Sequence, residues 1–288
     1  MTNLDLQLPK GYRVADTLAF HGRDPESPSE RVEGTLLRKA FWIGDRARVL
    51  SVRLEGTQAT ASVADGDTVP AATVRHLLGL HLDPSAFEAR VRRDRLFAPL
   101  VKARPGLRVL LTATPFEALV WAILGQQINL ALAFRLRQRV LRRYGAEVGG
   151  LVAHPRPQDL AAADPDELGA MQVSRAKAAC LIALSAAVAS GRLPLDDLAT
   201  WDFAEADARL CAEKGIGPWT SHYVLMRGLG LPDCVPVGDS ALATALERGL
   251  KLDARPSPKE VARLMAPYAP HRSMASFHLW AGLKGTPA

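Results

Sequence analysis

Cysteine is scarce in this sequence, and no part of it is apolar for long enough to cross a membrane. The three cysteines, Cys180, Cys211 and Cys234, are an odd number and lack the paired spacing of a metal site. No uninterrupted apolar run approaches the roughly 20 residues of a transmembrane helix, and no charged start precedes an apolar signal segment. We therefore expect a reduced, cytoplasmic protein without a membrane role.

Acidic residues are the minority among the charged ones. The chain has 36 lysines and arginines, most of them arginine, against 30 acids, a net charge of +6 and a pI of about 9.5. This balance favours a polyanionic partner without identifying it. With 288 residues, 48% of them hydrophobic, the chain suits a globular protein of two or three subdomains. The densest basic clusters are predicted to coat exposed helix faces: Arg90, Arg92, Arg93 and Arg95, then Arg135, Arg137, Arg139, Arg142 and Arg143.

The first 82 residues are predicted to form a small antiparallel sheet with one helix. From Leu50 to Glu55, apolar residues alternate with polar ones, as in a half-buried strand. Turns containing Gly44 and Gly56 separate this strand from its neighbours. The expected strands are residues 32–43, 46–54 and 57–63, and the expected helix is residues 69–80.

Helix signals dominate from residue 83 onward. Asp83-Pro84 and Thr114-Pro115 each place a capping side chain before a first-turn proline, and Glu117 is expected to complete a capping box. The second signal starts a long helix that is expected to end near Tyr144. Loops are expected at residues 104–106, 146–157 and 191–200, and further helices from residue 164 and over residues 174–190, 202–212, 239–250, 257–268 and 273–283. The predicted fold class is therefore α+β, with an all-α second part.

A glycine turn between two of these helices is the most informative local feature. The first helix should stop at Gly215, and the next should begin with Gly217 as N-cap and Pro218 at its first position. The two glycines remove two side chains from the turn, so its backbone N–H groups could approach a phosphate closely. Gly-x-Gly alone is common, however, and taken by itself it favours an ordinary connection between two helices.

The longer pattern around this turn resembles the helix-hairpin-helix DNA glycosylase superfamily, and within it the 3-methyladenine DNA glycosylase II family. The resemblance covers nearly the whole chain. It implies an α+β sheet domain at residues 1–82 and an all-α helix-hairpin-helix core at residues 83–288, whose two helical subdomains flank an active-site cleft. The residues that carry it are Glu213-Lys-Gly-Ile-Gly-Pro-Trp-Thr-Ser-His-Tyr223, Pro236-Val-Gly-Asp239, Ile123-Leu-Gly-Gln-Gln127, Arg272-Ser273 and His278-Leu-Trp280.

The resemblance implies that Asp239 is the catalytic carboxylate. Breaking a glycosidic C–N bond gives the sugar oxocarbenium character, and a nearby carboxylate stabilises that charge. Asp239 also suits the N-cap of the following helix, and the two roles are compatible because backbone donors favour an ionised carboxylate. Asp233 is the rival acid, but its spacing to the turn does not match the family.

The implied pocket for the damaged base is aromatic. Trp219 and Tyr223 lie one helical turn apart, where electron-rich rings would attract a purine made cationic by alkylation. Phe20 aligns with a pocket aromatic, although a core phenylalanine is the simpler interpretation. His271 replaces the family's stacking tryptophan, and Ser240 replaces the aromatic after its aspartate. Trp280 and Phe277 are interpreted as core residues at helical spacing.

The resemblance also implies contacts to double-stranded DNA. The sugar-phosphate backbone of the DNA would be held by Gly215, Gly217 and Thr220. Gln127 would fill the gap left by a flipped-out base. A neighbour of Gln127 could be the wedge instead, and a polar residue at a helix bend is an equally good interpretation of Gln127. We expect a monomer, associated with the nucleoid if the protein is bacterial.

Strand cleavage and an iron–sulfur cluster are not expected. Relatives that cut the strand carry a lysine two residues after the second glycine, where this chain has Trp219, so a Schiff base cannot form there. Residues 235–288 contain no cysteine for a cluster. No side-chain metal site is evident, although the turn carbonyls near Cys211, Glu213 and Gly215 suit a sodium or potassium ion. The alternatives are a non-catalytic DNA-binding protein and a glycosylase of the same fold that prefers deaminated or oxidised bases.

Overall fold

The computed structural model describes residues 3–64 and 67–283, and its packing divides the chain into two compact units. Unit 1 contains Met1–Leu78 and Thr112–Leu195, and unit 2 contains Gly79–Leu111 and Asp196–Ala288. Each unit combines two separate stretches of sequence. The predicted domain boundary at residue 82 stays a prediction, because packing groups the N-terminal sheet with a set of later helices.

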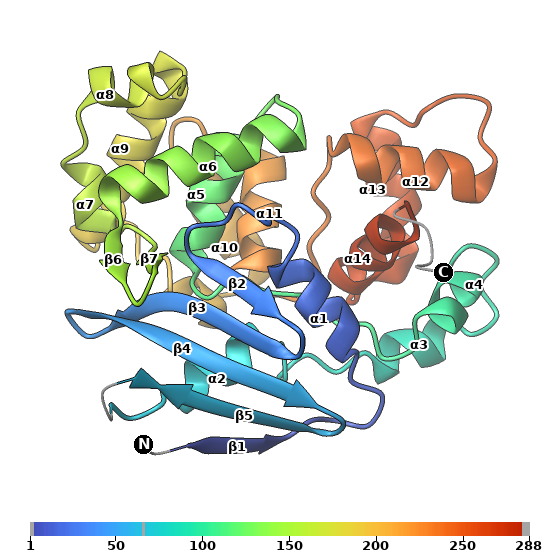
Figure 1. Cartoon of the computed structure of the whole chain (residues 1–288). Helices are drawn as coiled ribbons and strands as arrows, with labels where there is room; N and C mark the ends of the chain where they lie inside the picture. The colour runs from blue at the N-terminus through green and yellow to red at the C-terminus, as the bar shows by residue number, and fades with distance from the viewer. Residues whose placement is uncertain (1–2, 65–66, 284–288) are drawn as a thin grey trace. The chain divides into compact units, whose positions relative to one another are not determined.

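Unit 1 begins with the predicted antiparallel sheet (Figure 1). Its strands lie in the order β1-β5-β4-β3-β2, and all neighbours are antiparallel. The alternation read in β4 is confirmed, because Leu50, Val52 and Leu54 are buried. The strand expected over residues 32–43 is split by a turn at Gly34, whose φ of 60° favours glycine. The elements are β1 (Leu4–Gln7), α1 (Val14–His21), β2 (Glu30–Glu33), β3 (Leu36–Ile43), β4 (Arg46–Glu55), β5 (Gln58–Val63) and α2 (Ala71–Leu77); β1 and α1 were not predicted.

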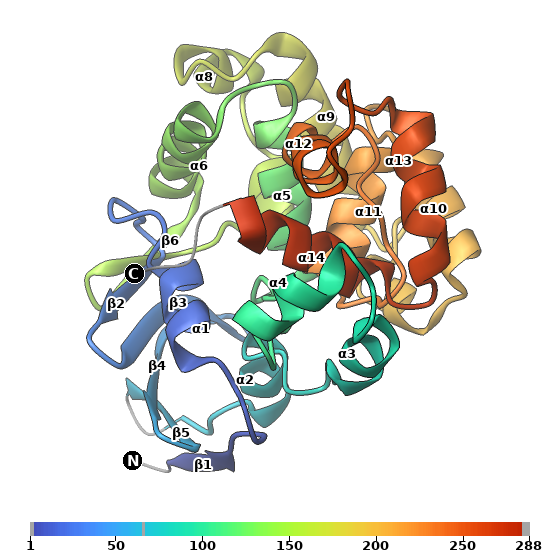
Figure 2. The ribbon, with the colours of Figure 1, turned by 90° about the vertical axis from the view of Figure 1, so that its right-hand side faces the viewer.

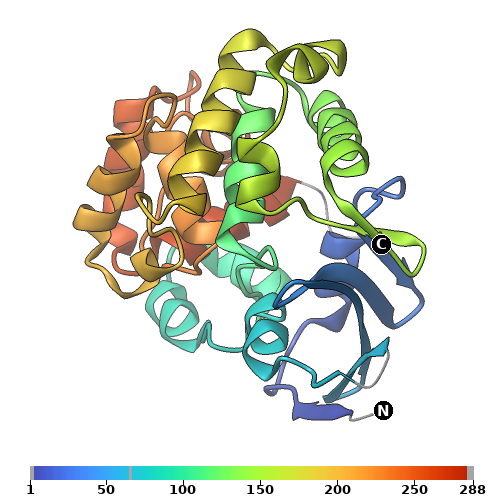
Figure 3. The same ribbon diagram turned by 90° about the vertical axis from the view of Figure 1, so that its left-hand side faces the viewer.

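Five helices complete unit 1, and α9 packs beside α5 and α7 (Figure 3). The single long helix expected after Thr114 is wrong, because the chain breaks at residues 126–129 and restarts with Asn129 as N-cap. The Asn129 Oδ1 atom accepts a hydrogen bond from the Leu132 N–H at 2.9 Å. The helices are α5 (Pro115–Gly125), α6 (Leu130–Tyr144), α7 (Pro157–Ala161), α8 (Pro165–Ala170) and α9 (Arg175–Ala189).

The stretch predicted as a loop after residue 146 contains a short hairpin instead. Strands β6 (Ala146–Val148) and β7 (Leu151–Ala153) pair around Gly149 and Gly150, which both have positive φ. Leu151 and Ala153 pack against the sheet residues Ala40 and Val49. Three-residue strands leave little periodicity in the sequence, so their burial against the sheet decides the conformation.

Unit 2 is helical, and α14 packs against α4 and α12 (Figure 2). The predicted capping box of α13 is confirmed: Ser257 Oγ accepts from the Glu260 N–H, and Glu260 Oε2 accepts from the Ser257 N–H at 2.8 Å. Among the described residues of both units, no helix combines the length and the apolar character that a membrane crossing requires. The helices are α3 (Ser85–Val91), α4 (Phe97–Ala103), η2 (Asp197–Thr200), α10 (Phe203–Cys211), α11 (Pro218–Arg227), α12 (Ser240–Leu250), α13 (Pro258–Met265), η3 (Ala266–Tyr268) and α14 (Arg272–Leu283).

Candidate active site

The predicted glycine turn joins α10 to α11 in unit 2. Asp202 caps α10 by accepting a hydrogen bond from the Ala204 N–H at 2.8 Å, and Gly215 has the φ of 92° that a residue with a side chain rarely adopts. Gly217 is the N-cap of α11, with Pro218 at its first position. Ile216 is buried between the two glycines and anchors the turn, while Gly215 and Gly217 face solvent. The helical hairpin is therefore confirmed, and its contact with DNA stays a prediction.

The loop from α11 to Asp239 is fastened at several points. The Ser273 hydroxyl accepts from the Cys234 N–H at 2.9 Å and donates to the Leu231 carbonyl at 2.6 Å. His222 of α11 accepts from the Val235 N–H through Nδ1 at 2.9 Å. These bonds fix the backbone that leads to Asp239, and they give a structural reason for Ser273 in the Arg272-Ser273 pair.

The rival acid Asp233 is held by Arg272, the other member of this pair. Its two carboxylate oxygens accept from Arg272 Nε at 2.7 Å and from the terminal Nη2 at 2.6 Å, a bidentate arrangement. Partial burial favours the protonated acid, but the hydrogen bonds and charge of Arg272 outweigh it and lower the pKa of Asp233. This carboxylate is ionised and engaged in holding the loop, which supports Asp239 as the reacting acid.

Asp239 presents its carboxylate at a half-buried position at the start of α12. Its Oδ1 atom accepts from the Leu242 N–H at 2.7 Å, the N-cap bond that the sequence predicts. The same oxygen accepts from the indole Nε1 of Trp280 at 3.0 Å, and Oδ2 accepts from the indole Nε1 of Trp219 at 3.1 Å. Hydrogen-bond donors on both oxygens hold the carboxylate in one orientation.

Trp219 and Tyr223 form the predicted aromatic pair. Their rings stack at a centroid distance of 5.4 Å with 24° between their planes. Because Trp219 also donates to Asp239, the stacked pair lies directly beside the candidate catalytic carboxylate. Thr220 lies between them on α11 and is only 2% exposed, so its predicted contact with DNA stays a prediction.

Trp280 was interpreted from the sequence as a core residue, and the structure corrects this. Its ring is half-buried, and its N–H is bonded to Asp239. A buried indole N–H needs a partner, and the residue belongs to the His278-Leu-Trp280 pattern, so these two signals together could have identified it. Phe277, three positions before Trp280 on α14, is half-buried, with the Arg227 guanidinium 5.1 Å from its ring centroid.

The remaining predicted site residues are His271, Phe20 and Gln127. His271 lies just before α14, where its N–H donates to the Tyr268 carbonyl at 2.8 Å. Phe20 and Gln127 belong to unit 1. Phe20 is half-buried at the end of α1, with the Arg23 guanidinium 3.8 Å above its ring, and Gln127 is exposed in the turn between α5 and α6 with a φ of 56°. Their roles stay predictions.

Metal ligation by side chains was not expected from the sequence. Within the part of the chain that the structure describes, no group of three or more His, Cys, Asp and Glu side chains could hold a metal ion. The proposed cation on the carbonyls of the turn involves backbone atoms and stays a prediction.

Comparison with known proteins places these features in a family. A family model described as HhH-GPD superfamily base excision DNA repair protein matches residues 120–270, more than half of the chain, including the hairpin and Asp239. The chain is similar to the DNA-3-methyladenine glycosylase of Bacillus subtilis, with 26% identity over 96% of this chain and 95% of the relative. It is 33% identical to DNA-3-methyladenine glycosylase 2 of Escherichia coli over 72% of this chain and 77% of the relative.

A solved structure confirms the fold over almost the full length. The 3-methyladenine DNA glycosylase of Archaeoglobus fulgidus superposes with a TM-score of 0.85, covering 98% of each chain, at 22% sequence identity. On the strength of the family model and the Escherichia coli relative, this chain belongs to the HhH-GPD superfamily of base excision DNA repair proteins.

Proposed function

We propose that this protein is a DNA glycosylase that releases alkylated purines, such as 3-methyladenine, from double-stranded DNA by hydrolysis. The observation that carries the proposal is the carboxylate of Asp239, held between the indole N–H groups of Trp219 and Trp280. The names of the relatives from Bacillus subtilis and Escherichia coli support the same substrate class. The protein would act as a monomer and would need no cofactor.

Asp239 supplies negative charge where the reaction develops positive charge. As the C–N bond breaks, the sugar acquires oxocarbenium character, and an ionised carboxylate beside it lowers the energy of that state. The bonds from Leu242, Trp219 and Trp280 orient the carboxylate before the substrate arrives, so little reorganisation is needed during the reaction. The carboxylate can also orient the attacking water.

The stacked rings of Trp219 and Tyr223 supply the preference for alkylated bases. Alkylation at N3 or N7 leaves a purine with positive charge and a weakened glycosidic bond. A cation over an aromatic face gains about 0.5–2 kcal/mol per contact. Because this pair lies beside Asp239, a base held by the rings would place its sugar near the carboxylate.

Base release without strand cleavage is the second part of the proposal. A strand-cutting mechanism needs an amine that attacks the sugar, and position 219 carries an indole whose N–H is bonded to Asp239. We therefore expect no covalent enzyme–DNA adduct when the reaction is run with borohydride. Borohydride-trapped enzyme in amounts comparable to released base would contradict this part and leave the first intact.

Asp239→Asn is the direct test of the active site. Asparagine keeps the shape and can still cap α12 through its carbonyl oxygen, but it lacks the negative charge. We expect release of 3-methyladenine from methylated DNA to be abolished, with binding to an abasic-site analogue largely retained. Near-normal release by the variant would show that Asp239 is not the catalytic group. Binding by the unaltered protein without any release would instead support a non-catalytic DNA-binding protein, and release of deaminated bases alone would support a different substrate class.

A further inference from the structure

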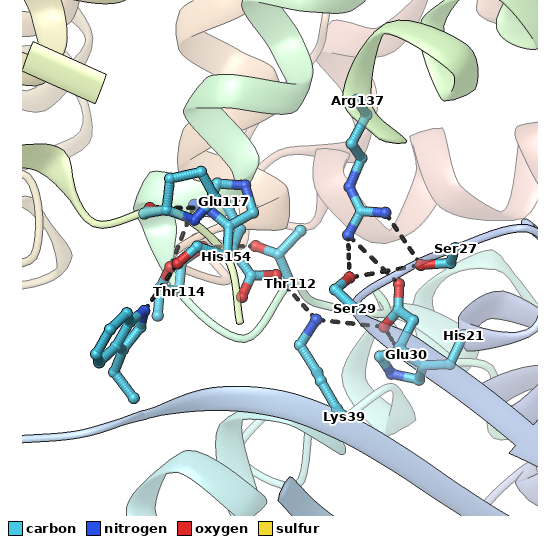
Figure 4. Close-up of polar contacts among 12 residues, drawn as sticks. His21, Ser27, Ser29, Glu30, Lys39, Thr112, Thr114, Glu117, Arg137 and His154 are labelled. Atoms are coloured by element: carbon cyan, nitrogen blue, oxygen red, sulfur yellow. Dashed lines mark hydrogen bonds and ion pairs between the residues drawn. The ribbon is translucent and has the colours of Figure 1, made fainter. Parts of the chain in front are cut away.

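A cluster of buried charges joins the sheet of unit 1 to helices α5 and α6 (Figure 4). Lys39 of β3 lies 3.3 Å from Glu30 of β2 and 3.0 Å from Glu117 of α5. Arg137 of α6 lies 3.7 Å from Glu30 and donates to the Ser29 hydroxyl at 2.8 Å. We call Glu30, Lys39, Glu117 and Arg137 the buried charge cluster, since each side chain is at most 11% exposed.

Two sequence predictions are corrected by this cluster. Arg137 was expected on an exposed helix face, but its guanidinium is buried because Glu30 and Ser29 neutralise and satisfy it. Glu117 was expected to complete a capping box at Thr114. Thr114 does accept from the Glu117 N–H at 3.1 Å, but the Glu117 carboxylate pairs with Lys39.

The four groups are charged and balance one another. Burial favours neutral acids, but attraction to Lys39 and the bond from His21 outweigh it and lower the pKa of Glu30 well below its usual value. The pKa of Glu117 is likewise lowered despite burial, mainly by Lys39. Burial lowers the pKa of His21, so this ring is neutral and its Nδ1–H donates to Glu30 Oε2 at 3.0 Å.

Such a cluster is a costly way to stabilise a fold. Each charge must leave water, and replacing a buried ion pair by apolar residues of similar volume is often neutral or stabilising. In some proteins, buried polar or ionic groups select a single relative position of the elements that carry them.

The cluster holds the segments that carry Phe20 and Trp121. His21, which is bonded to Glu30, follows Phe20 directly on α1. Glu117 lies one helical turn before Trp121 on α5. The Arg23 guanidinium lies 3.8 Å from the Phe20 ring and 5.5 Å from the Trp121 ring, so it bridges the two aromatics.

The same residues line a small cavity. Phe20, Trp121 and Arg23 form part of its wall, together with His21 and the cluster. Its volume of ≈ 20 Å³ is enough for about one water molecule and far too small for a purine. The cluster therefore does not contact a flipped-out base in this cavity. If the cluster affects such a base, the effect must pass through the aromatic side chains of Phe20 and Trp121.

We infer that the buried charge cluster is a positioning device that fixes Phe20 relative to Trp121 and thereby sets the rate at which an alkylated base is released. The inference rests on the proposed function and on the assignment of Phe20 to the base pocket. It gives the sheet of unit 1 a role in the reaction: β2 and β3 supply the two charges, Glu30 and Lys39, that hold α1 and α5 in place.

The test is the double variant Lys39→Met with Glu117→Gln. Removing one positive and one negative charge leaves Glu30 paired with Arg137 and His21, whereas a single change would leave a buried charge uncompensated. We expect the single-turnover release of 7-methylguanine to fall about tenfold, the scale of one cation–aromatic contact. Affinity for an abasic-site analogue should stay unchanged, because this ligand has no base for Phe20 to hold.

A mutant cycle with Phe20→Ala separates positioning from general support of the fold. If the cluster acts through Phe20, the triple variant should release base no more slowly than Phe20→Ala alone. Additive losses, or a folded double variant with an unchanged rate, would overturn the inference. His21→Phe is the second variant, since it removes the bond to Glu30 without changing any charge, and it should show a smaller loss that also disappears in the Phe20→Ala background.

The matched control is an exposed ion pair in the same unit. Arg143 and Glu167 lie 2.6 Å apart with side chains 53% and 39% exposed, so Arg143→Met with Glu167→Gln removes the same charges at the surface. This variant should keep the full rate. If the unaltered protein releases no alkylated base, the proposed function fails and the inference with it, whereas an active protein with an unaffected double variant refutes the inference alone.

Discussion

Replacing Trp280 by phenylalanine should slow base release without weakening DNA binding. The change keeps a smaller aromatic ring at a half-buried position but removes the N–H that donates to Asp239 Oδ1 at 3.0 Å. A hydrogen bond to a charged group is worth about 1.5–3 kcal/mol, which corresponds to roughly 10- to 150-fold in rate if it is lost entirely in the transition state. Water reaches this half-buried site and would replace part of the bond, so we expect a fall of about 10- to 30-fold.

The assay for Trp280→Phe is single-turnover release of 7-methylguanine at saturating enzyme, with affinity for an abasic-site analogue measured in parallel. Only the rate should change, because Trp280 is bonded to the carboxylate and the N-cap bond from Leu242 remains. Trp201→Phe is the matched control: Trp201 is 38% exposed in the same unit, and its replacement should have no effect. An unchanged rate in a folded Trp280→Phe variant would refute the idea that this indole orients Asp239.

The hairpin and the buried charge cluster give two further tests. A methyl group added at Gly217 would meet open space, and the φ of −100° at Gly217 suits any residue, so Gly217→Ala should have the melting temperature of the unaltered protein. The added methyl group should keep the DNA backbone from approaching the turn closely, so the variant should bind all DNA severalfold more weakly. Equal affinity in a filter-binding titration would show that Gly217 is not part of the interface. The pKa values of Glu30 and Glu117 are lowered from 4.5 in the folded state, so their stabilisation is complete above about pH 4.5 and is lost as the pH falls below it. As the pH is lowered, the melting temperature should therefore fall more steeply for the unaltered protein than for Lys39→Met with Glu117→Gln. Parallel curves of melting temperature against pH would contradict this.

The hairpin and the position of Asp239 could be predicted because their signals are local. A glycine that ends one helix, a glycine and proline that begin the next, and an aspartate before a helical stretch each act within a few residues. The structure shows all of them as expected, in Gly215, Gly217, Pro218 and Asp239. Assigning chemistry to them required the family resemblance, since the same signals occur in ordinary helical connections.

The surroundings of Asp239 could not be predicted because they depend on contacts between distant residues. Trp280 lies 41 positions from Asp239, and helical spacing shows that the tryptophan faces inward without showing what it faces. Arg137 was misjudged for the same reason. Its neighbours in sequence are basic, but its partner Glu30 comes from a strand more than 100 residues earlier.

The break between α5 and α6 was missed because the residue that makes it is not a glycine. Gln126 has φ −55° and ψ 128°, and Gln127 follows with a φ of 56°, which matches the two central positions of a type II turn. The second of these positions normally carries glycine or asparagine. Because neither residue stands at position 127, the sequence predicts an unbroken helix from Pro115 to Tyr144.

The strain at Gln127 bears on its proposed function. Among the residues that the structure describes, two others with side chains also have positive φ, Gln172 and Lys251, but both lie at helix C-termini, where this conformation is common. Gln127 follows an extended residue in the turn, and a left-handed conformation costs a residue with a side chain about 1–2 kcal/mol. The turn is held from both sides, by Lys177 Nζ donating to the Leu124 carbonyl at 2.7 Å and by the Asn129 cap. The Gln127 side chain is exposed and gains little from packing, so packing of this residue does not offset the strain of its backbone. The strain therefore supports the proposal that this glutamine enters the gap left by a flipped-out base.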